Sequence, residues 1–330
     1  MTRTTAIACA AGAAFTCLAS HAAAQDFLLV SDATGDKIIR YEYETGAPID
    51  HFVGKGISPL NNPIFLRVTP DGDIAAASRA SDSIELYDGD TGKWLRTLVA
   101  PGTGGLNEPR DLVFDADGFI YVASAANNRV IKYTAEGAFD RNLITSGLQE
   151  PSGLAIGPDG LLYVSSRDND LVRSYHTDTG DRAERLPIEN TGIDGPTALA
   201  FGPDGSLYIA GRHSDSIIRV PAFGVPSVLV SNSPVLDGPS QFAFDADGDL
   251  LVVSQDTDTI VRFDAQTGAF AGSLLTPGLA GGLNDAVGIA FLTATAPDTP
   301  GCNGADIDAN GVLNVDDIEA FVIEYTAGCP

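Results

Sequence analysis

The sequence predicts an all-β protein: a six-bladed β-propeller whose ring is closed by pairing N-terminal strands with a C-terminal strand, followed by a small α-helical tail. Three observations predict the propeller. A unit of roughly 43 residues recurs along the chain, each unit carries an Asp-Gly turn between two apolar runs, and partial copies of the unit flank the series. A period of this length with four strands per unit is typical of propeller blades.

The complete units begin at prolines, and one of them reads PSGLAIGPDGLLYVSSRDNDLVRSYHTDTG. Their first residues are Pro63, Pro109, Pro151, Pro196 and Pro239. Each unit holds an apolar run, a PDG or ADG turn, a second apolar run, a polar turn, an alternating third run and often a TG turn before a fourth. Asp-Gly between alternating apolar residues indicates a hairpin, because the turn needs positive φ and these residues adopt it easily.

The sixth blade is split between the two ends of the repeat region. The segment DFLLVSDATGDKIIRYEYETG, from Asp26, supplies three strands, and AVGIAFL, from Ala286, supplies an innermost strand with nothing after it. Pairing these segments closes the ring and leaves no exposed sheet edge. The sequence therefore predicts a propeller over residues 25–293.

The pattern PxGLAxxPDGxLYVxxxxxxxVxxY resembles the NHL-type and SMP-30-like six-bladed propellers, and the resemblance extends over most of the predicted propeller. It implies the fold and leaves the activity open, because members of these families include scaffolds, lactonases and lyases. An SMP-30-like lactonase is expected to carry a metal-binding glutamate in an early PEG-like turn, and this sequence has none.

The first 24 residues are typical of a secretory signal peptide. Arg3 precedes an apolar run, and the small residues Ala22 and Ala24 favour cleavage before Gln25. The apolar run is too short to span a bilayer, so we predict a secreted or cell-envelope protein without a membrane span. The net charge of −25 argues against nucleic acid or an anionic membrane as a partner.

One face of the ring is expected to carry the functional residues. In propellers of this kind, the loops entering the innermost strands and those joining strands two and three lie around the mouth of the central channel. At these repeat positions the chain has an acidic or amide set and a basic set. The acidic or amide set is Asn62, Glu108, Glu150 and Asp285, and the basic set is Arg79, Arg110, Arg167 and Arg212.

Three interpretations of these two sets stay open. They could neutralise each other as ion pairs between blades. The arginines could instead bind an anionic ligand such as a uronate-bearing glycan, since guanidinium groups grip carboxylates in a bidentate manner. The carboxylates could also hold a divalent metal ion through oxygen ligands.

Catalysis has little support in the sequence. After the leader, the histidines are His51, His176 and His213, and there is no HExxH motif, nucleophile elbow or glycine-rich phosphate loop. His51 and His176 are expected on outer strands. His213 is expected on the channel face beside Arg212, and it is the one weak catalytic candidate.

The tail contains a predicted calcium loop, DIDANGVLNVDD. Oxygen ligands recur at the spacing that an EF-hand-like loop uses, and Gly311 stands where the loop turns sharply. The predicted ligands are Asp306, Asp308, Asn310, the Val312 carbonyl, Asn314 and Asp317. Apolar residues at helical spacing predict a short amphipathic helix over residues 315–327, and Ca²⁺ is the expected cofactor.

Cys302 and Cys329 bracket this loop and are predicted to form a disulfide, because extracytoplasmic compartments are oxidising. The loop, helix and closing TAGCP resemble the cysteine-flanked dockerin-like tails of some secreted bacterial proteins. The resemblance implies a cohesin-like or envelope receptor as a partner, although dockerins normally have two such repeats and this chain has one. We assign residues 294–300 to a linker and 301–330 to this tail.

Together these features predict an exported, non-enzymatic binding or scaffold propeller, tethered to a surface or assembly by its calcium-dependent tail. The alternative is an extracellular lyase or lactonase that acts on a carbohydrate or a lactone at the channel mouth.

Overall fold

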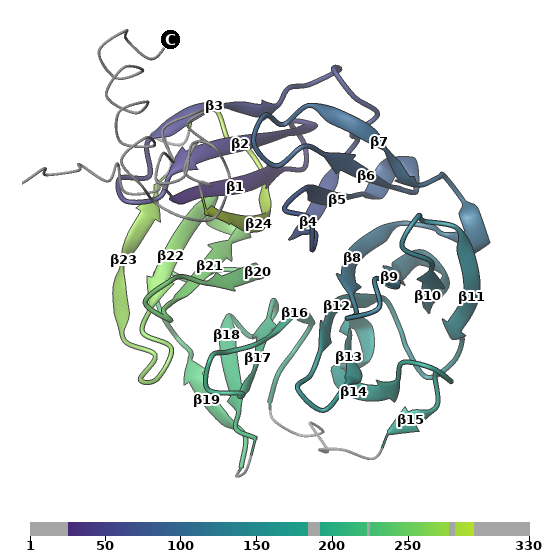
Figure 1. The fold of residues 1–330 in the computed structure, drawn as a ribbon. Coiled ribbons are helices and arrows are strands. Elements are labelled where there is room, and N and C mark those ends of the chain that lie inside the picture. Colours follow the sequence, from purple (N-terminus) through teal and green to yellow (C-terminus); the bar gives the residue numbers. More distant parts are fainter. Residues whose placement is uncertain (1–25, 184–191, 223–224, 277–280, 294–330) are drawn as a thin grey trace, which may run out of the picture. The chain divides into compact units, whose positions relative to one another are not determined.

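The computed structural model describes residues 26–183, 192–222, 225–276 and 281–293 (Figure 1). In this part of the chain, six four-stranded antiparallel sheets are arranged as the blades of a propeller. The predicted fold class is confirmed for the propeller. The predicted leader, linker and tail lie outside the described residues. Within the described ranges, no helix is long and apolar enough to cross a membrane.

Each blade runs from an inner strand at the channel to an outer strand at the rim. Blade 1 contains β24 (Ala286–Thr293), β1 (Asp26–Asp32), β2 (Lys37–Glu42) and β3 (Pro48–Val53). Blade 2 contains β4 (Pro63–Val68), β5 (Ile74–Ser78), β6 (Ser83–Tyr87) and β7 (Trp94–Val99). Blade 3 contains β8 (Pro109–Phe114), β9 (Ile120–Ser124), β10 (Arg129–Tyr133) and β11 (Phe139–Ile144).

The remaining blades follow the same order. Blade 4 contains β12 (Pro151–Ile156), β13 (Leu161–Ser166), β14 (Leu171–His176) and β15 (Arg182–Ala183). Blade 5 contains β16 (Pro196–Phe201), β17 (Leu207–Gly211), β18 (Ser216–Val220) and β19 (Ser227–Val230). Blade 6 contains β20 (Pro239–Phe244), β21 (Leu250–Ser254), β22 (Thr259–Phe263) and β23 (Phe270–Leu275).

The ring closes as the sequence predicts. β1 pairs antiparallel with β24, with Phe27 opposite Leu292 and Val30 opposite Ile289. Each inner strand also contacts the inner strands of both neighbouring blades, from β24 to β4 and onward to β20 and back to β24. The first and last described strands therefore belong to one blade, and blade 1 lies three places from blade 4 around the channel.

The core lies between neighbouring sheets, because each sheet is apolar on both faces. One cluster packs Tyr121 and Val130 of blade 3 against Leu154, Leu162 and Tyr175 of blade 4. Tyr121 and Leu162 are fully buried. Long runs of apolar residues such as LLYV therefore form strands buried on both faces.

A repeated contact fixes the loops at the channel mouth. In each blade a residue with positive φ between the second and third strands accepts a hydrogen bond from a backbone N–H at or directly before the start of the next inner strand. The accepting residues are Asp36, Asp82, Asn128, Asp170, Asp215 and Asp258. Aspartate and asparagine suit this position because they tolerate the left-handed conformation and their short side chains reach the neighbouring loop.

A second repeated contact explains the glycines of the TG and EG turns. Gly137 has φ +83°, and a Cβ at this position would lie 1.6 Å from the carbonyl oxygen of Leu98 in the preceding blade. Gly137→Ala is expected to lower the free energy of unfolding by about 2–3 kcal/mol, since it combines left-handed strain with a backbone clash. The urea midpoint followed by fluorescence of Trp94, the single tryptophan of the chain, measures this change.

Gly160→Ala is the matched control. Gly160 has φ +76°, but a Cβ there would meet nothing within 4 Å. Only the conformational cost of about 1 kcal/mol is therefore expected. Equal losses in the two variants would show that the contact between blades is unimportant.

Candidate functional site at the channel mouth

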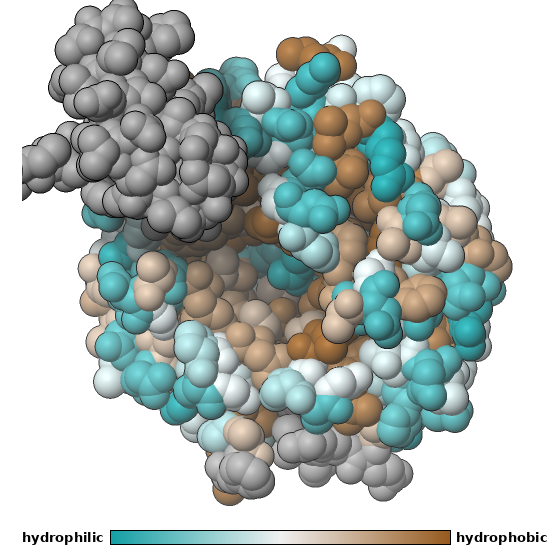
Figure 2. Space-filling model, in the orientation of Figure 1, coloured by the Kyte–Doolittle hydropathy of each residue, from teal (hydrophilic) through white to brown (hydrophobic). Residues whose placement is uncertain are grey.

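A cavity of about 380 Å³ lies at the mouth of the central channel. The second residue of each inner strand lines it, so every blade contributes at least one side chain. These residues are Ile64, Arg110, Ser152, Thr197, Ser240 and Val287. Figure 2 shows a hollow at the centre of this face, with both hydrophobic and hydrophilic residues around it.

The structure brings the candidate residues together around this cavity. The cavity lining includes seven of them: Asn62, Arg79, Arg110, Glu150, Arg167, Arg212 and Asp285. Glu108 lies beside Arg79 in an adjoining hollow. His213 contacts Arg167. These repeat positions lie near one another because equivalent loops of a propeller meet at one end of the channel.

Most of these charges are paired. Arg79 donates to Glu108 Oε2 through Nη2 at 2.8 Å and through Nε at 3.0 Å. Arg110 Nη2 and Arg167 Nη1 both bind Oε1 of Glu150, the latter at 2.9 Å. The Arg79 and Arg110 pairs link neighbouring blades, as the ion-pair interpretation predicts.

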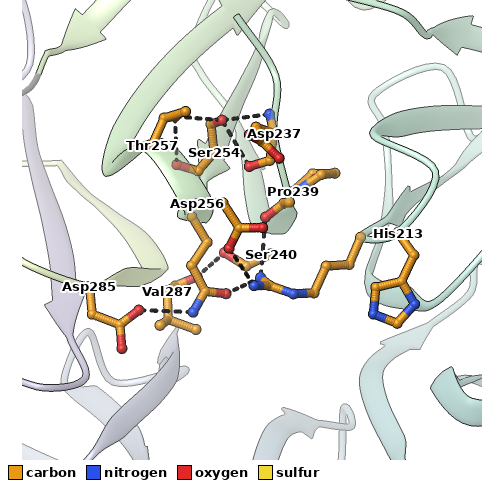
Figure 3. A network of polar contacts seen from close by, with 12 residues as sticks. His213, Asp237, Pro239, Ser240, Ser254, Asp256, Thr257, Asp285 and Val287 are labelled. Atoms are coloured by element: carbon orange, nitrogen blue, oxygen red, sulfur yellow. Dashed lines mark hydrogen bonds and ion pairs between the residues drawn. The ribbon is translucent and has the colours of Figure 1, made fainter.

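Arg212 belongs to a separate network (Figure 3). Its Nη2 lies 2.5 Å from Asp256 Oδ1, and its Nη1 donates to Gln255 Oε1. The Gln255 amide in turn donates to Asp285 Oδ1 at 2.9 Å. In Figure 3, Asp285 and His213 lie on opposite sides of this network. Gln255 therefore connects an arginine to a carboxylate that has no direct arginine partner among the ion pairs described.

Glu108 and Glu150 occupy a strained backbone position. Both have φ of 50°, and glycines Gly195 and Gly238 stand at the equivalent places of blades 5 and 6 with φ of 60° and 59°. A glutamate in the left-handed region costs about 1–2 kcal/mol that glycine does not incur. Strain of this kind is concentrated at functional sites, where a particular side chain is needed.

Asp168 lies next to Glu150 and was missed in the sequence. Burial opposes ionisation of Glu150, but the hydrogen bond from Asp168 and the charges of Arg110 and Arg167 outweigh it and lower the pKa of Glu150. The hydrogen bond to Glu150, with partial burial and the like charge, raises the pKa of Asp168. Asp168 and His213 share one repeat position, which is the signal that could have found Asp168.

Asp168→Asn tests the hydrogen bond between Asp168 and Glu150. The pKa of Asp168 is raised on folding. Its contribution to the free energy of unfolding is therefore fully present below the ordinary aspartate pKa and is lost as the pH rises through the raised value. Asparagine stays neutral, so the variant is expected to match the wild type at about pH 3 and to be more stable at pH 8. The gain should stay below about 1 kcal/mol, since Asp168 is exposed. Urea midpoints across this range measure it, and a variant less stable at pH 8 would contradict the arrangement.

His213 has the geometry of a general base. Its Nδ1 lies 3.2 Å from Asp194 Oδ1, and its Nε2 lies 3.4 Å from Arg167 Nη2. A guanidinium can only donate, so Nε2 is an acceptor and the ring proton lies on Nδ1, facing Asp194. The Gly195 backbone leaves room for the ring, because a Cβ there would lie 2.6 Å from Nδ1.

The other histidines lie away from the mouth. His51 is exposed on the outermost strand β3, as predicted. His176 is exposed at the end of β14, which is the third strand of its blade and not the outermost one. β14 is the third of the four strands counted from the channel, so His176 lies in the outer half of its blade and away from the mouth.

A buried ion pair joins the inner strands of three blades. Arg67 of β4 binds Asp111 of β8 through two bonds, Nη2 to Oδ2 at 2.6 Å and Nε to Oδ1 at 2.9 Å. Asp111 Oδ2 also accepts the backbone N–H of Leu154 in β12 at 2.8 Å. Asp111 is fully buried, and burial raises its pKa although Arg67 and two backbone N–H groups oppose the shift.

A metal site was predicted in the tail, and a metal ion was one of three interpretations at the channel mouth. In the described ranges, no group of three or more His, Cys, Asp or Glu residues is placed to hold a metal ion. The acids at the mouth contact arginines or Gln255 instead. The predicted calcium ligands and the cysteine pair lie outside the described residues. These are Asp306, Asp308, Asn310, Val312, Asn314, Asp317, Cys302 and Cys329.

Comparison with known families gives one match. The model described as "Lactonase, 7-bladed beta-propeller" matches residues 65–225, a segment that contains Arg79, Arg167 and His213. The matched family is described with seven blades, whereas the described residues of this chain form six sheets. No curated protein matches the chain.

Solved structures of similar fold include proteins of unlike function. A chain in the crystal structure of a nidogen/laminin complex has a TM-score of 0.67 at 19% identity, covering 82% of this chain and 99% of that chain. A streptogramin B lyase has a TM-score of 0.53 at 16% identity, covering 79% of this chain and 76% of that chain. A virginiamycin B lyase from Staphylococcus aureus has a TM-score of 0.50 at 18% identity, covering 63% and 68%. At these identities the likeness concerns the fold, and it confirms the propeller.

Proposed function

We propose that this protein is an extracytoplasmic enzyme that opens a lactone or a related ester at the mouth of its propeller channel. The observation that carries the proposal is the arrangement of His213 between Asp194 and the cavity-lining Arg167. The lactonase model matches the segment that contains all three residues. That match and the lyases of similar fold favour the enzymatic alternative over the non-enzymatic scaffold expected from the sequence.

In the proposed reaction, Arg167 turns from Nε2 of His213 to the lactone carbonyl oxygen, and the freed Nε2 accepts a proton from water while the water oxygen forms a bond to the carbonyl carbon. Arg167 and Arg110 stabilise the negative charge that develops on the carbonyl oxygen. Burial lowers the pKa of Arg110 to about 10, so its guanidinium stays charged at neutral pH. As the ring C–O bond breaks, the imidazolium returns the proton to the leaving alkoxide, and Asp194 stabilises the imidazolium meanwhile.

A second reaction uses the same base. His213 could remove a proton from the carbon adjacent to the ester-bearing carbon, so that a C=C bond forms and the carboxylate leaves. The two lyases of similar fold favour this course. Product mass separates the two reactions, because hydrolysis of a cyclic ester adds one water and elimination adds none.

A panel of γ-lactones, δ-lactones, aryl esters and cyclic depsipeptides tests the proposal. We expect the wild type to open at least one class, and Arg167→Met to lower kcat/KM by about 10²–10³-fold. Arg219→Met is the matched control, because Arg219 pairs with Asp204 away from the cavity lining. Absence of turnover across the panel would favour the binding or scaffold reading.

We also propose that the tail binds calcium and tethers the propeller to an envelope or cohesin-like receptor. The spacing of the oxygen-bearing residues in DIDANGVLNVDD supports this proposal. Calcium titration of the full chain by calorimetry is expected to lose about one bound ion per chain in the Asp306→Ala/Asp308→Ala variant. Unchanged stoichiometry would exclude this loop as the site.

A further inference from the structure

We propose that the cavity at the channel mouth binds a small ligand with two unlike ends. A carboxylate or lactone carbonyl lies at the arginines of blades 3 and 4, and an apolar body lies against blades 1 and 2. The inference rests on the proposed function in that both use this cavity. It adds the substrate class, which is a lactone with an apolar substituent, and its product, the corresponding hydroxy acid.

The charge of the cavity lining favours an anion or a polarised carbonyl. Four arginines and two acids line the cavity, in a chain whose net charge is −25. Arg110 and Arg167 share a single carboxylate oxygen of Glu150, and the Nε atoms of both are buried without a hydrogen-bond partner. These two guanidinium groups therefore have more donor capacity than Glu150 satisfies.

The apolar residues of the lining all belong to blades 1 and 2, where they lie among the polar Asn62, Arg79 and Asp285. Ala33 and Val287 belong to blade 1, Ile64 and Phe65 belong to blade 2, and all four line the cavity. Blade 1 lies three places from blade 4 in the ring, so Ala33 and Val287 are across the channel from Arg167, and Ile64 and Phe65 lie two places from it. Figure 3 likewise shows Val287 on the side of the Arg212 network away from His213.

This division argues against the uronate-bearing glycan considered from the sequence. Sugar hydroxyls pressed against Val287 and Ile64 would lose hydrogen bonds to water without gaining partners there. An alkyl or aryl group would instead gain from burial against these two side chains. A volume of about 380 Å³ is near the lower end for ligand pockets and suits a single small molecule.

Equilibrium binding of sodium octanoate to the full chain tests the inference without any turnover. Octanoate is expected to bind at least about tenfold more tightly than glucuronate, which lacks the apolar body, and than 1-octanol, which lacks the charge. Arg110→Gln should weaken octanoate binding by about tenfold, since a charge-assisted hydrogen bond is lost. Val287→Asn should weaken octanoate binding by a similar factor and leave glucuronate binding unchanged.

Arg219→Gln is the matched control for charge removal, and circular dichroism confirms that each variant folds. If Arg110→Gln does not fold, Val287→Asn still separates octanoate from glucuronate. Tighter binding of glucuronate than of octanoate would overturn the inference. So would an equal loss of affinity in Arg219→Gln and Arg110→Gln.

The two proposals can fail separately. If octanoate binds as expected and no lactone is opened, the proposed function is wrong and the ligand class stands. If lactones are opened while octanoate neither binds nor inhibits, the ligand class is wrong and the proposed function stands.

Discussion

The His213→Ala variant is expected to open lactones with a kcat about 10²–10⁴-fold lower than the wild type, the range typical for loss of a general base. KM should change little, because Arg110 and Arg167 are the groups that contact the bound carbonyl in the proposed reaction. The imidazole is well placed for this role, since Asp194 fixes its tautomer and Nε2 faces Arg167. Initial rates at saturating substrate measure the effect.

Two further variants separate a base from a structural residue. His176→Ala is the matched control, because His176 is exposed at the end of β14 and should leave kcat unchanged. Added imidazole should partly restore the rate of His213→Ala and not that of Arg167→Met. A His213→Ala variant with wild-type kcat would remove His213 from the mechanism.

Asp194 is a positioning residue in this scheme. Asp194→Asn is expected to lower kcat less than His213→Ala does and to leave KM unchanged, because the amide no longer holds the ring proton on Nδ1. A merely structural role for Asp194 would change KM as well.

The architecture could be predicted from the sequence because each blade repeats the same local signals. Prolines such as Pro109 and Pro151 mark the start of inner strands, and Gly118 and Gly160 mark the hairpins that follow. The split blade was predictable for a physical reason. The inner strand that begins at Ala286 is not followed by further strands of the repeat. It therefore needs to pair with the strand that begins at Asp26.

The candidate site was also predictable in part, because repeat position translates directly into position around the ring. The contact between His213 and Asp194 follows the same rule. The backbone N–H of His213 bonds to the Asp194 carbonyl as that of Asp168 bonds to Gln149, so an alignment of the repeats places the two residues together. Asp194 lies two residues before Pro196, whereas the predicted acidic set comprises residues directly before the start of each inner strand.

The Arg67–Asp111 pair could not be predicted in this way. Asp111 is two residues after its proline and Arg67 is four after its own, so the pair joins unlike repeat positions. Blade 6 has Ala243 at the position of Arg67, and blade 4 has Gly153 at the position of Asp111. The repeat period therefore does not predict this ion pair. Contacts that break the repeat are therefore visible only in three dimensions.

Asp111→Ala is expected to lower the free energy of unfolding by about 3–5 kcal/mol, the cost of leaving a buried partner charge without compensation. Arg67 loses both of its bonds to the carboxylate, and the Leu154 N–H loses its acceptor. These contacts connect β4, β8 and β12, so the substitution destabilises the packing of three blades. The urea midpoint followed by Trp94 fluorescence measures it.

Asp50→Ala is the matched control, because it removes the carboxylate of an exposed ion pair. Asp50 makes the same two-bonded pair with Arg40, but its side chain is 43% exposed, so its removal should cost less than about 1 kcal/mol. The double variant Arg67→Met/Asp111→Leu removes both charges and should recover much of the loss, because no unpaired ion remains. Failure to recover would mean that the backbone contacts of Asp111, and not its charge, hold the inner strands together.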